Sequence, residues 1–464
     1  MTFAVLKGGN GKAEGGKTQE RNFPTSNFPL RRRKISKSAK SPNGERISTY
    51  ICAMQIIIIG GGAAGFFAAI RCAELNPAAE VTLLERGKDV LGKVKISGGG
   101  RCNVTHACYV PKELVKFYPR GAKELLGPFN RFACGDTQAW YEDRGVELKI
   151  EDDGRIFPTS DRSQSIMDCL LQSAERAGVK VLCQKNVIAL SPPSEEHKQW
   201  KLLCQKDETF FADKLMIATG SNARIWERLE ELGHHIIPPV PSLFTFNIKD
   251  DRIKDLPGIS VPKAQIKIPQ LKLQTDGPLL ITHWGLSGPA ILKLSAWGAR
   301  AFADCQYRFT IFVNWINENT EEVAGELKAT KTQFSKRKPF NHAMYGLPTR
   351  LWQSMLRASD IPETINWADL NKTQLNKLAT ELTQASFQVD GKSTFKEEFV
   401  TAGGIDLKEI DFKQFKSKII PELYLAGEIL NIDALTGGFN FQAAWTGGWI
   451  AGEAMAECLF GGRL

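Results

Sequence analysis

The sequence predicts an α/β fold that is built on a parallel β-sheet and interrupted by an insertion. Two observations support this prediction. The segment "MQIIIIGGGAAGFFAAI", residues 54–70, places a short apolar strand directly before a glycine-rich turn and a helix. Strands of the same buried character return near the end of the chain, at "FVTAGGIDL" and "ELYLAGEIL", after a long stretch of shorter strands. The first and last parts of the chain are therefore expected to share one sheet.

The apolar run from Tyr50 to Ile70 holds 21 uncharged residues behind the basic segment "RRRKISKSAK", which is also the length and polarity of a membrane span. Its centre argues against a span. Residues 56–59 are four isoleucines, which favour a buried strand, and three consecutive glycines then end the strand. We therefore expect a strand followed by a helix over residues 66–75, with a membrane span as the alternative.

Gly60, Gly62 and Gly65 fit the GxGxxG pattern in the turn between this strand and the helix. A second strand follows at "EVTLLERG" and ends at Glu85, 20 residues after Gly65. At this spacing an acidic side chain meets the adenosine ribose of a bound dinucleotide, while the glycines let the backbone and the helix N-terminus approach the pyrophosphate. The pattern predicts a dinucleotide-binding βαβ unit. A glycine-rich turn in an ordinary parallel sheet is the alternative.

The formal net charge of +9 is concentrated in residues 1–53, which hold 11 of the 60 Lys/Arg residues and 3 of the 51 Asp/Glu residues. The remainder, with 49 basic and 48 acidic residues, is nearly neutral, so no nucleic-acid partner is expected. Residues 1–53 lack apolar periodicity and are expected to be a disordered basic extension outside the fold, with a targeting peptide as the alternative. We expect a cytoplasmic protein that does not insert into a membrane.

The ten cysteines and six histidines form no CxxC, HxxxH or HExxH pattern. Without such spacings we expect neither a metal site nor a disulfide framework. The cysteines are expected to be reduced and mostly buried.

The remaining elements follow in order after Glu85. A second glycine-rich loop, "LGKVKISGGGRCNVTH", covers residues 91–106 and leaves the edge of the sheet at which a dinucleotide would lie. Residues 110–150 are expected to be helical, "GVELKIEDDGRIFPTSD" to form a hairpin, and "SQSIMDCLLQSAERAGV" to form a helix that ends at Gly178. Strands follow, the last of which, "KLMIATG", is buried and ends at Ala218, Thr219 and Gly220.

Four parts of the fold follow from these elements. The first part of the nucleotide-binding domain covers residues 54–239. Short strands without regular intervening helices predict a β-barrel-like insertion over residues 240–318, and residues 319–390 are expected to be helical before they return to the barrel. The second part of the nucleotide-binding domain covers residues 391–464.

Six motifs together resemble one known family. They are "IIIIGGGAAG", "KISGGGRCNVT", "GRIFPTSD", "THWGLSGPAIL", "VTAGGI" and "GEILNIDALTGGFNFQAAWTGG". In order and spacing they resemble, over residues 54–458, the BaiN/RdsA-type flavoproteins, which are also described as aminoacetone-oxidase-like. The resemblance implies an FAD-dependent oxidoreductase whose Rossmann-like FAD domain is split by an inserted small β-barrel and a helical subdomain.

The resemblance also implies which residues hold the cofactor. The glycines of the first turn would hold the pyrophosphate, Lys95 with residues 97–103 the remaining phosphate and the flavin edge, and Glu428 the ribityl chain. The full cofactor-binding set is Gly60, Gly62, Ala63, Ala64, Gly65, Glu85, Arg86, Lys93, Lys95, Ser97, Gly98, Gly99, Gly100, Arg101, Cys102, Asn103, Ala218, Thr219, Gly220, Gly427, Glu428, Gly437, Gly438, Phe439 and Asn440.

Two features depart from the family pattern. The loop after the ATG strand is shorter than is usual in the family, and Asn431 and Ala434 stand where many members carry Asp and Gly. The second difference removes one expected charge near Asn431, whereas Asp433 remains.

The motif "LTGGFNFQAAW" predicts how the protein tunes the flavin. Gly437 and Gly438 open the last helix, so their amides and the positive helix end can face the N1/O2 region of the ring, where a reduced flavin carries negative charge. An ordinary glycine-capped helix start is the alternative. His283, on a loop of the insertion, is a candidate for proton transfer, with a structural role as the alternative. Cys102 is expected to pack rather than react, because no partner cysteine stands at CxxC spacing.

These observations predict an FAD-dependent oxidoreductase that transfers hydride between flavin N5 and a small organic substrate. No second GxGxxG with a preceding strand follows residue 100, so NAD(P)H is expected as a transient co-substrate in the same cleft. Two alternatives are an FAD-dependent oxidase that acts on a small amine and uses oxygen, and a non-catalytic FAD-binding or RNA-associated protein.

Overall fold

The computed structural model describes residues 36–40, 46–50, 54–393 and 400–457. The chain divides into two units, residues 1–53 and residues 54–464. In the first unit, β1 (Ser36–Lys40) and β2 (Arg46–Tyr50) pair as an antiparallel two-stranded sheet. These ten residues form strands where disorder was expected. The assignment of residues 1–53 to an extension outside the fold stays a prediction. The rest of the basic extension lies outside the described residues.

The second unit contains the predicted parallel sheet, with the strand order β22-β23-β24-β12-β3-β4-β8. The strands from β24 to β8 run parallel, whereas β22 and β23 are antiparallel. The strands are β3 (Gln55–Ile59), β4 (Glu80–Leu84), β8 (Lys180–Leu182), β12 (Lys214–Ile217), β22 (Ile410–Asp411), β23 (Lys416–Ser417) and β24 (Leu423–Leu425). Because β24 pairs with β12, the late part of the chain completes the sheet that the early part begins. The predicted fold class is confirmed.

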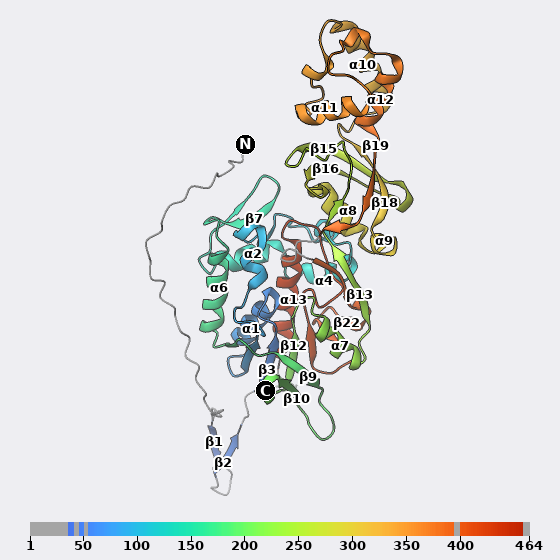
Figure 1. Ribbon diagram of the computed structural model, residues 1–464. Coiled ribbons are helices and arrows are strands. Elements are labelled where there is room, and N and C mark those ends of the chain that lie inside the picture. The colour runs from blue at the N-terminus through green and yellow to red at the C-terminus, as the bar shows by residue number, and fades with distance from the viewer. Residues whose placement is uncertain (1–35, 41–45, 51–53, 394–399, 458–464) are drawn as a thin grey trace, which may run out of the picture. The chain divides into compact units, whose positions relative to one another are not determined.

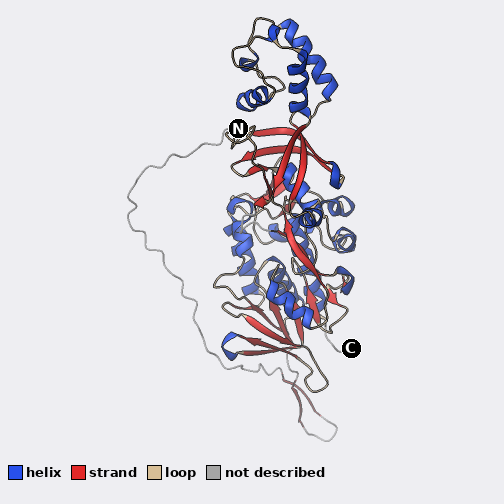
Figure 2. Cartoon of the chain, turned by 45° about the vertical axis from the view of Figure 1, so that its right-hand side comes forward, coloured by secondary structure: helices blue, strands red, loops and turns tan. Residues whose placement is uncertain are grey.

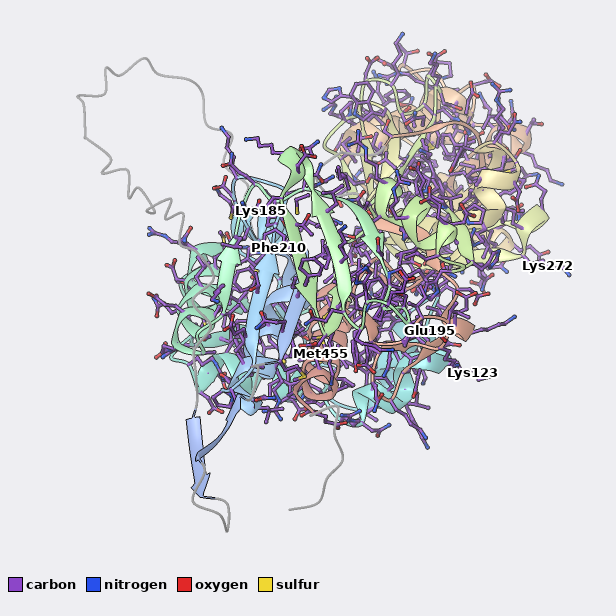
Figure 3. All side chains as sticks on the ribbon, turned by 90° about the horizontal axis from the view of Figure 1, so that it is seen from below. Lys123, Lys185, Glu195, Phe210, Lys272 and Met455 are labelled. Atoms are coloured by element: carbon purple, nitrogen blue, oxygen red, sulfur yellow. The ribbon has the colours of Figure 1, made fainter. Side chains whose placement is uncertain are left out.

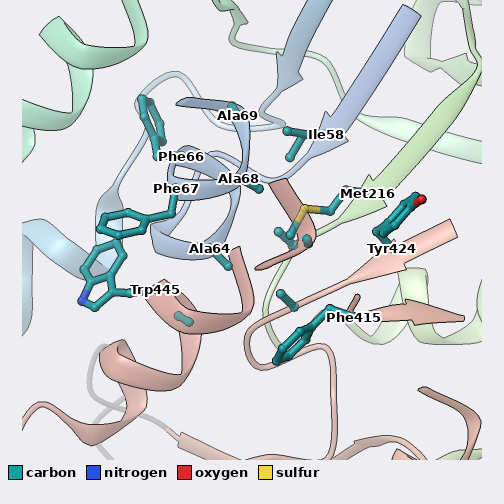
Figure 4. Packing of buried hydrophobic residues seen from close by; sticks show 14 of the residues in the cluster. Ile58, Ala64, Phe66, Phe67, Ala68, Ala69, Met216, Phe415, Tyr424 and Trp445 are labelled. Carbon is teal, nitrogen blue, oxygen red and sulfur yellow. The ribbon is translucent and has the colours of Figure 1, made fainter. Parts of the chain in front are cut away.

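Two helices pack against each other beside this sheet, α1 (Ala63–Leu75) and α13 (Phe439–Ala456) (Figure 1). Small residues permit the close approach, since a Cβ atom on Gly448 would lie 2.4 Å from Ala64 O. Phe67 and Trp445 pack beside this contact, with ring centroids 4.6 Å apart (Figure 4). The apolar core of this part of the chain therefore joins its first helix to its last.

Two small sheets, β5-β7-β6 and β11-β10-β9, accompany the parallel sheet. Their strands are β5 (Thr105–His106), β6 (Leu148–Ile150), β7 (Arg155–Pro158), β9 (Val187–Ser191), β10 (Trp200–Cys204) and β11 (Thr209–Ala212). The helices of this part are α2 (Gly92–Gly100), α3 (Pro111–Leu114), α4 (Ala122–Phe129), α5 (Cys134–Glu142), α6 (Ser163–Arg176) and α7 (Ala223–Glu231). The predicted hairpin is β6–β7, and the predicted helix before Gly178 is α6.

A second large sheet occupies the middle of the chain, with the order β19-β18-β15-β16-β17-β14-β20 and antiparallel pairs throughout. Its strands are β14 (Thr245–Asn247), β15 (Ser260–Ile268), β16 (Leu273–Thr282), β17 (Gly285–Ser287), β18 (Arg308–Asn314), β19 (Ala385–Asp390) and β20 (Lys392–Ser393). After Gly391 the chain passes from β19 to β20, which pairs with β14. The sheet therefore curls into a small barrel (Figures 1 and 2).

Helices α8 (Pro289–Trp297) and α9 (Ala299–Asp304) interrupt the strands of this barrel. The expectation of strands without intervening helices was wrong for this stretch. Pro289 at the first helical position and Gly298 directly after Trp297 are typical helix boundaries. The prediction followed the apolar strand patterns on either side instead.

The helical part of the insertion lies between β18 and β19 in the chain and consists mainly of α10 (Thr320–Gln333), α11 (Thr349–Ala358) and α12 (Lys372–Thr383), which gather in one group (Figure 1). The insertion is connected through β13 (Ile236–Ser242) and β21 (Val400–Ile405), which pair as an antiparallel two-stranded sheet. The predicted boundary between residues 239 and 240 falls inside β13.

Charged side chains cover the surface and apolar ones fill the interior. Figure 3 shows Lys123, Glu195 and Lys272 extending outward from the ribbon, whereas Met455 is fully buried. Among the helices of the described residues, none combines the length and hydropathy that a membrane crossing needs.

Candidate cofactor site

The turn between β3 and α1 brings three backbone segments into close contact. Gly60 has φ +111°, and a Cβ atom there would lie 2.4 Å from Ala218 O. A Cβ atom on Gly65 would lie 2.0 Å from Gly60 O. Glycine is therefore required at both positions. The close approach also places the predicted segment 218–220, at the end of β12, beside the GxGxxG motif.

Gly62 differs from these two glycines because its side-chain position is open. No atom lies within 4 Å of the place that a Cβ atom on Gly62 would take. Gly62 is the N-cap of α1, and within the described part of the chain no side-chain hydrogen bond caps this helix. Open space beside uncapped helical amides fits the pyrophosphate of a dinucleotide.

Glu85 lies directly after β4, at the place that the GxGxxG spacing predicts. Its carboxylate accepts hydrogen bonds from Gly61 N at 2.8 Å and from Gly87 N at 2.7 Å. These contacts fix the carboxylate beside the glycine-rich turn. Arg86 is exposed next to it. The contact of Glu85 with an adenosine ribose stays a prediction.

The second glycine-rich segment is only partly the loop that we expected. It begins as the short helix α2 and leaves helical geometry at Ser97, with Gly98 and Gly99 at φ +58° and +68°. Gly99 and Gly100 have open space at their Cβ positions, whereas a Cβ atom on Gly98 would lie 2.9 Å from the Phe157 ring. The run of glycines therefore makes a tight turn with an accessible backbone at its tip. Lys95, on α2 before this turn, is exposed.

Lys93 on α2 forms an ion pair with Glu428, which follows β24. Gly427, with φ +81°, approaches the Ala64 side chain, and the Cβ position of Gly220 lies 3.7 Å from Glu428 Oε2. The structure therefore brings together four predicted segments that are separated by up to several hundred residues in the sequence. They meet at the carboxyl edge of the parallel sheet, where such folds bind ligands.

Arg101 is held by an ion pair and a ring contact, and Cys102 is buried. The Arg101 guanidinium pairs with Glu151 at 2.6 Å and stacks over the Phe157 ring at 3.9 Å. Cys102 is fully buried with φ +62°, and burial raises the pKa of its thiol to about 12. Both side chains shape the turn, and the Cys102 thiol is held in its unreactive form.

Residues 437–440 open α13 against β5. A Cβ atom on Gly438, which has φ +92°, would lie 2.6 Å from Thr105 O. When its amide oxygen faces Gly438, Asn103 accepts a hydrogen bond from Gly438 N at 3.0 Å and donates one to Thr105 O at 2.9 Å. In that orientation Asn103 engages the Gly438 amide. The contact of residues 437 and 438 with a flavin stays a prediction. Among the residues that the structure describes, no side-chain hydrogen bond caps the α13 N-terminus.

Asn440 and Phe439 hold this segment in place. Asn440 exchanges two hydrogen bonds with the backbone of Ala434, at 2.9 Å and 3.1 Å. The Phe439 ring packs against two rings, Phe117 at 4.1 Å and His106 at 4.6 Å between centroids. These two members of the predicted set support the turn at residues 437 and 438.

Sequence reasoning did not identify His106, which lies beside Gly437 and Phe439. Its Nε2 lies 3.1 Å from Asp153 O, and because a carbonyl only accepts, Nε2 carries the proton. Burial lowers the pKa of His106, so the ring is neutral at pH 7. Nδ1 is then an acceptor, and it is buried without a partner among the described residues. The sequence does indicate His106 in one way, because His106 ends the glycine-rich segment "SGGGRCNVTH" that is predicted to bind the cofactor.

His283 lies exposed in the turn between β16 and β17 of the barrel. No hydrogen bond joins it to a predicted cofactor-binding residue within the described part of the chain. Its suggested role in proton transfer therefore gains no support from its contacts.

A serine, a histidine and a glutamate form a linear network elsewhere in this unit. His234 Nδ1 lies 2.7 Å from Glu409 Oε2, and Ser417 Oγ lies 3.0 Å from His234 Nε2. This arrangement resembles a hydrolytic triad, but Ser417 Oγ also accepts hydrogen bonds from Ile419 N and Ile420 N. Ser417 and His234 are both buried, so the network is structural. In residues 54–393 and 400–457, no group of three His, Cys, Asp or Glu side chains is arranged to bind a metal ion.

The sequence model of the HI0933-like protein Rossmann domain matches residues 54–454. The chain belongs to the HI0933-like family. The BaiN/RdsA-type resemblance is thereby confirmed, and the chain is an FAD-dependent oxidoreductase. The glycine turn, the uncapped α1 and Glu85 fit this cofactor, because they combine room for a pyrophosphate with an acceptor at the ribose position.

Two curated relatives and one solved structure align with most of the chain. A 3-dehydro-bile acid delta(4,6)-reductase from Clostridium scindens is 27% identical over 422 residues, which is 87% of this chain and 99% of the relative. A ribosomal RNA dihydrouridine synthase from Haemophilus influenzae is 27% identical over 401 residues, 84% of this chain and 95% of the relative. A 3-ketosteroid-delta4-(5alpha)-dehydrogenase from Rhodococcus jostii, 15% identical, aligns over 91% of this chain and all of its own with a TM-score of 0.47.

Proposed function

We propose that this protein uses NAD(P)H to reduce a carbon–carbon double bond that is conjugated to a carbonyl group in a small molecule. FAD, when bound, supplies two-electron hydride chemistry. The reaction adds a hydride to the β-carbon of the substrate and a proton to the α-carbon, and NAD(P)H is oxidised to NAD(P)⁺.

One observation carries this proposal. The two relatives that align over almost their full lengths have names that describe the same bond change. A 3-dehydro delta(4,6) bile acid has double bonds conjugated to a ketone, and dihydrouridine forms by saturation of the uracil double bond that is conjugated to a carbonyl. Conjugation makes the β-carbon electrophilic, so it can accept a hydride.

Two further features support the choice of a small molecule in a reducing compartment. From residue 54 onward the chain has 49 basic and 48 acidic residues, so it lacks the excess positive charge that RNA phosphates favour. The eight cysteines among the described residues are all free, which is typical of cytoplasmic proteins. We therefore propose a cytoplasmic enzyme with a small-molecule substrate.

Anaerobic flavin reduction tests the proposal. The purified FAD-loaded protein is mixed with NADH or NADPH, and the flavin absorbance is followed in a stopped-flow instrument. We expect reduction by one of the two nicotinamides, followed by reoxidation with a 3-oxo-4,6-diene steroid and no reoxidation with the saturated 3-oxo steroid.

Two other oxidants distinguish the alternatives. If an rRNA fragment reoxidises the flavin and the small molecules do not, the substrate is RNA. Rapid reoxidation by oxygen, with no response to any conjugated carbonyl compound, would contradict the proposed reductase and favour an oxidase.

A further inference from the structure

Three charged side chains meet where the insertion joins the nucleotide-binding part. Arg120, which precedes α4, forms a two-pronged ion pair with the fully buried Asp433. Ser242, at the end of β13, donates a hydrogen bond to Asp433 Oδ2 at 2.8 Å. Arg300, on α9, donates to Pro238 O in β13 at 3.1 Å. Residues from both parts of the chain therefore build one polar cluster.

The ion pair satisfies Arg120 and Asp433 almost completely. Arg120 Nη2 also donates to Ala296 O, in the last turn of α8, at 2.8 Å, where a cation is favoured by the helix dipole. Arg120 and Asp433 thus neutralise each other, and their hydrogen-bonding groups are engaged. Neither of them has a free charge to offer a ligand.

Arg300 is different. Its Nη2 is buried and makes no hydrogen bond within the described part of the chain, and Arg300 forms no ion pair there. Burial and the neighbouring Arg120 lower the pKa of Arg300, whereas Asp433 and the exposed Asp304 raise it. The guanidinium nevertheless keeps its charge at neutral pH, because arginine is protonated far above it. The cluster therefore carries one uncompensated positive charge and one buried donor.

The cluster also lies near the predicted cofactor site. Burial raises the pKa of Asp433. Hydrogen bonds from Arg120 and Ser242 lower this pKa, and the charge of Glu428 raises it. Glu428 is the acid at the end of β24, so its charge and the cluster are within electrostatic reach of each other.

We propose that Arg300, held in place beside the Arg120–Asp433 pair, binds an anionic group, a carboxylate or a phosphate, that the substrate carries. A guanidinium presents a planar pair of donors that suits either anion. Only the assignment of the anion to the substrate rests on the proposed function. The presence of the anion site does not depend on which reaction the protein catalyses.

Anion binding to the FAD-loaded full-length protein tests this inference, because FAD at its predicted site would keep acetate and phosphate away from the α1 N-terminus. Acetate and inorganic phosphate are titrated separately by calorimetry, at constant ionic strength in chloride. We expect saturable binding of at least one of them, and a loss of affinity of about tenfold or more in Arg300→Gln, as for removal of a charge-assisted hydrogen bond. The anion that binds identifies whether a carboxylate or a phosphate is recognised.

Two variants control this experiment. Arg308→Gln removes an exposed arginine of the same barrel, whose partner is Asp390, and should bind the anion as the wild type does. Arg300→Lys keeps the charge and should retain part of the affinity, so it serves if Arg300→Gln does not fold. Unchanged affinity in the Arg300 variants, or no saturable binding of either anion to the wild type, would overturn the inference.

The same proteins separate this inference from the proposed function. Flavin content and the rate of flavin reduction by NAD(P)H should be the same in the control Arg308→Gln and in the wild type. If the wild type binds the anion but NAD(P)H does not reduce its flavin, the proposed function fails while the anion site stands.

Discussion

Gly62 and Gly65 lie three residues apart in one turn, yet an added side chain meets different surroundings at each. Space is open at Gly62, so Gly62→Asp should fold normally and place a carboxylate beside the pyrophosphate. We expect FAD affinity to fall by about a hundredfold or more, equivalent to about 2.7 kcal/mol, while the melting temperature of the FAD-free protein is unchanged. Flavin titration and thermal unfolding measure the two effects.

Gly65→Ala is the contrasting variant, because its Cβ atom would lie 2.0 Å from Gly60 O. It should lose stability as well as FAD. Folded Gly62→Asp protein with normal flavin content would show that the pyrophosphate does not lie at this turn.

Cys102 should make the stability of the protein depend on alkaline pH. Burial raises the pKa of the folded thiol to about 12 from 9.0, so the native state keeps a proton that the unfolded chain loses as the pH rises above 9. Stability contributed by the neutral thiol is therefore complete below pH 9 and is lost as the pH rises towards 12. Cys102→Ala should show a shallower decline in unfolding free energy between pH 8 and 10.5, measured by urea denaturation. Equal slopes would mean that the thiol is not shielded from water.

At the scale of elements, the contact between α1 and α13 depends on the absence of a side chain at Gly448. The Cβ atom of Gly448→Ala would lie 2.4 Å from Ala64 O, which is backbone and cannot move without displacing α1. We expect a loss of about 2 kcal/mol or more of unfolding free energy, as for an overpacked core. Chemical denaturation with a far-ultraviolet signal measures it.

Gly325→Ala is the matched control for this contact. Gly325 is also inside a helix, α10, but nothing lies within 4 Å of its Cβ position. The same change should stabilise the protein by about 0.5–1 kcal/mol, because alanine restricts the unfolded chain and favours the helix. A similar response from both variants would contradict the close packing of α1 on α13.

At the scale of the whole molecule, the described strands and helices of the nucleotide-binding part and of the insertion all come from residues 54 onward. A protein that begins at Met54 should therefore keep the melting temperature and the flavin content of the full chain. A clear fall in melting temperature on removal of residues 1–53 would show that this segment stabilises the fold. Differential scanning calorimetry of the two proteins, both loaded with FAD, makes the comparison.

Local spacing explains which parts of the site could be predicted. Gly60, Gly62, Gly65 and Glu85 belong to one βαβ unit, in which the lengths of strand, turn and helix fix where each residue lies. The place of Ala218 could be predicted in the same way, because Ala218 follows a buried parallel strand that ends at the same edge of the sheet. The helix α2 was not predicted, because its three consecutive glycines indicate a loop although the residues before them form a helix.

The sequence by itself determined the parallel sheet, the nucleotide-binding turn and the place of the insertion, because each depends on periodicity or spacing over a few tens of residues. Only the tertiary structure decided that Asn103 lies beside Gly438, that His106 stacks on Phe439, and that Arg300 has no ion-pair partner among the described residues. These contacts join residues that lie far apart in the chain. Their geometry depends on how helices and strands pack, and this packing cannot be predicted from a pattern within a short stretch of sequence.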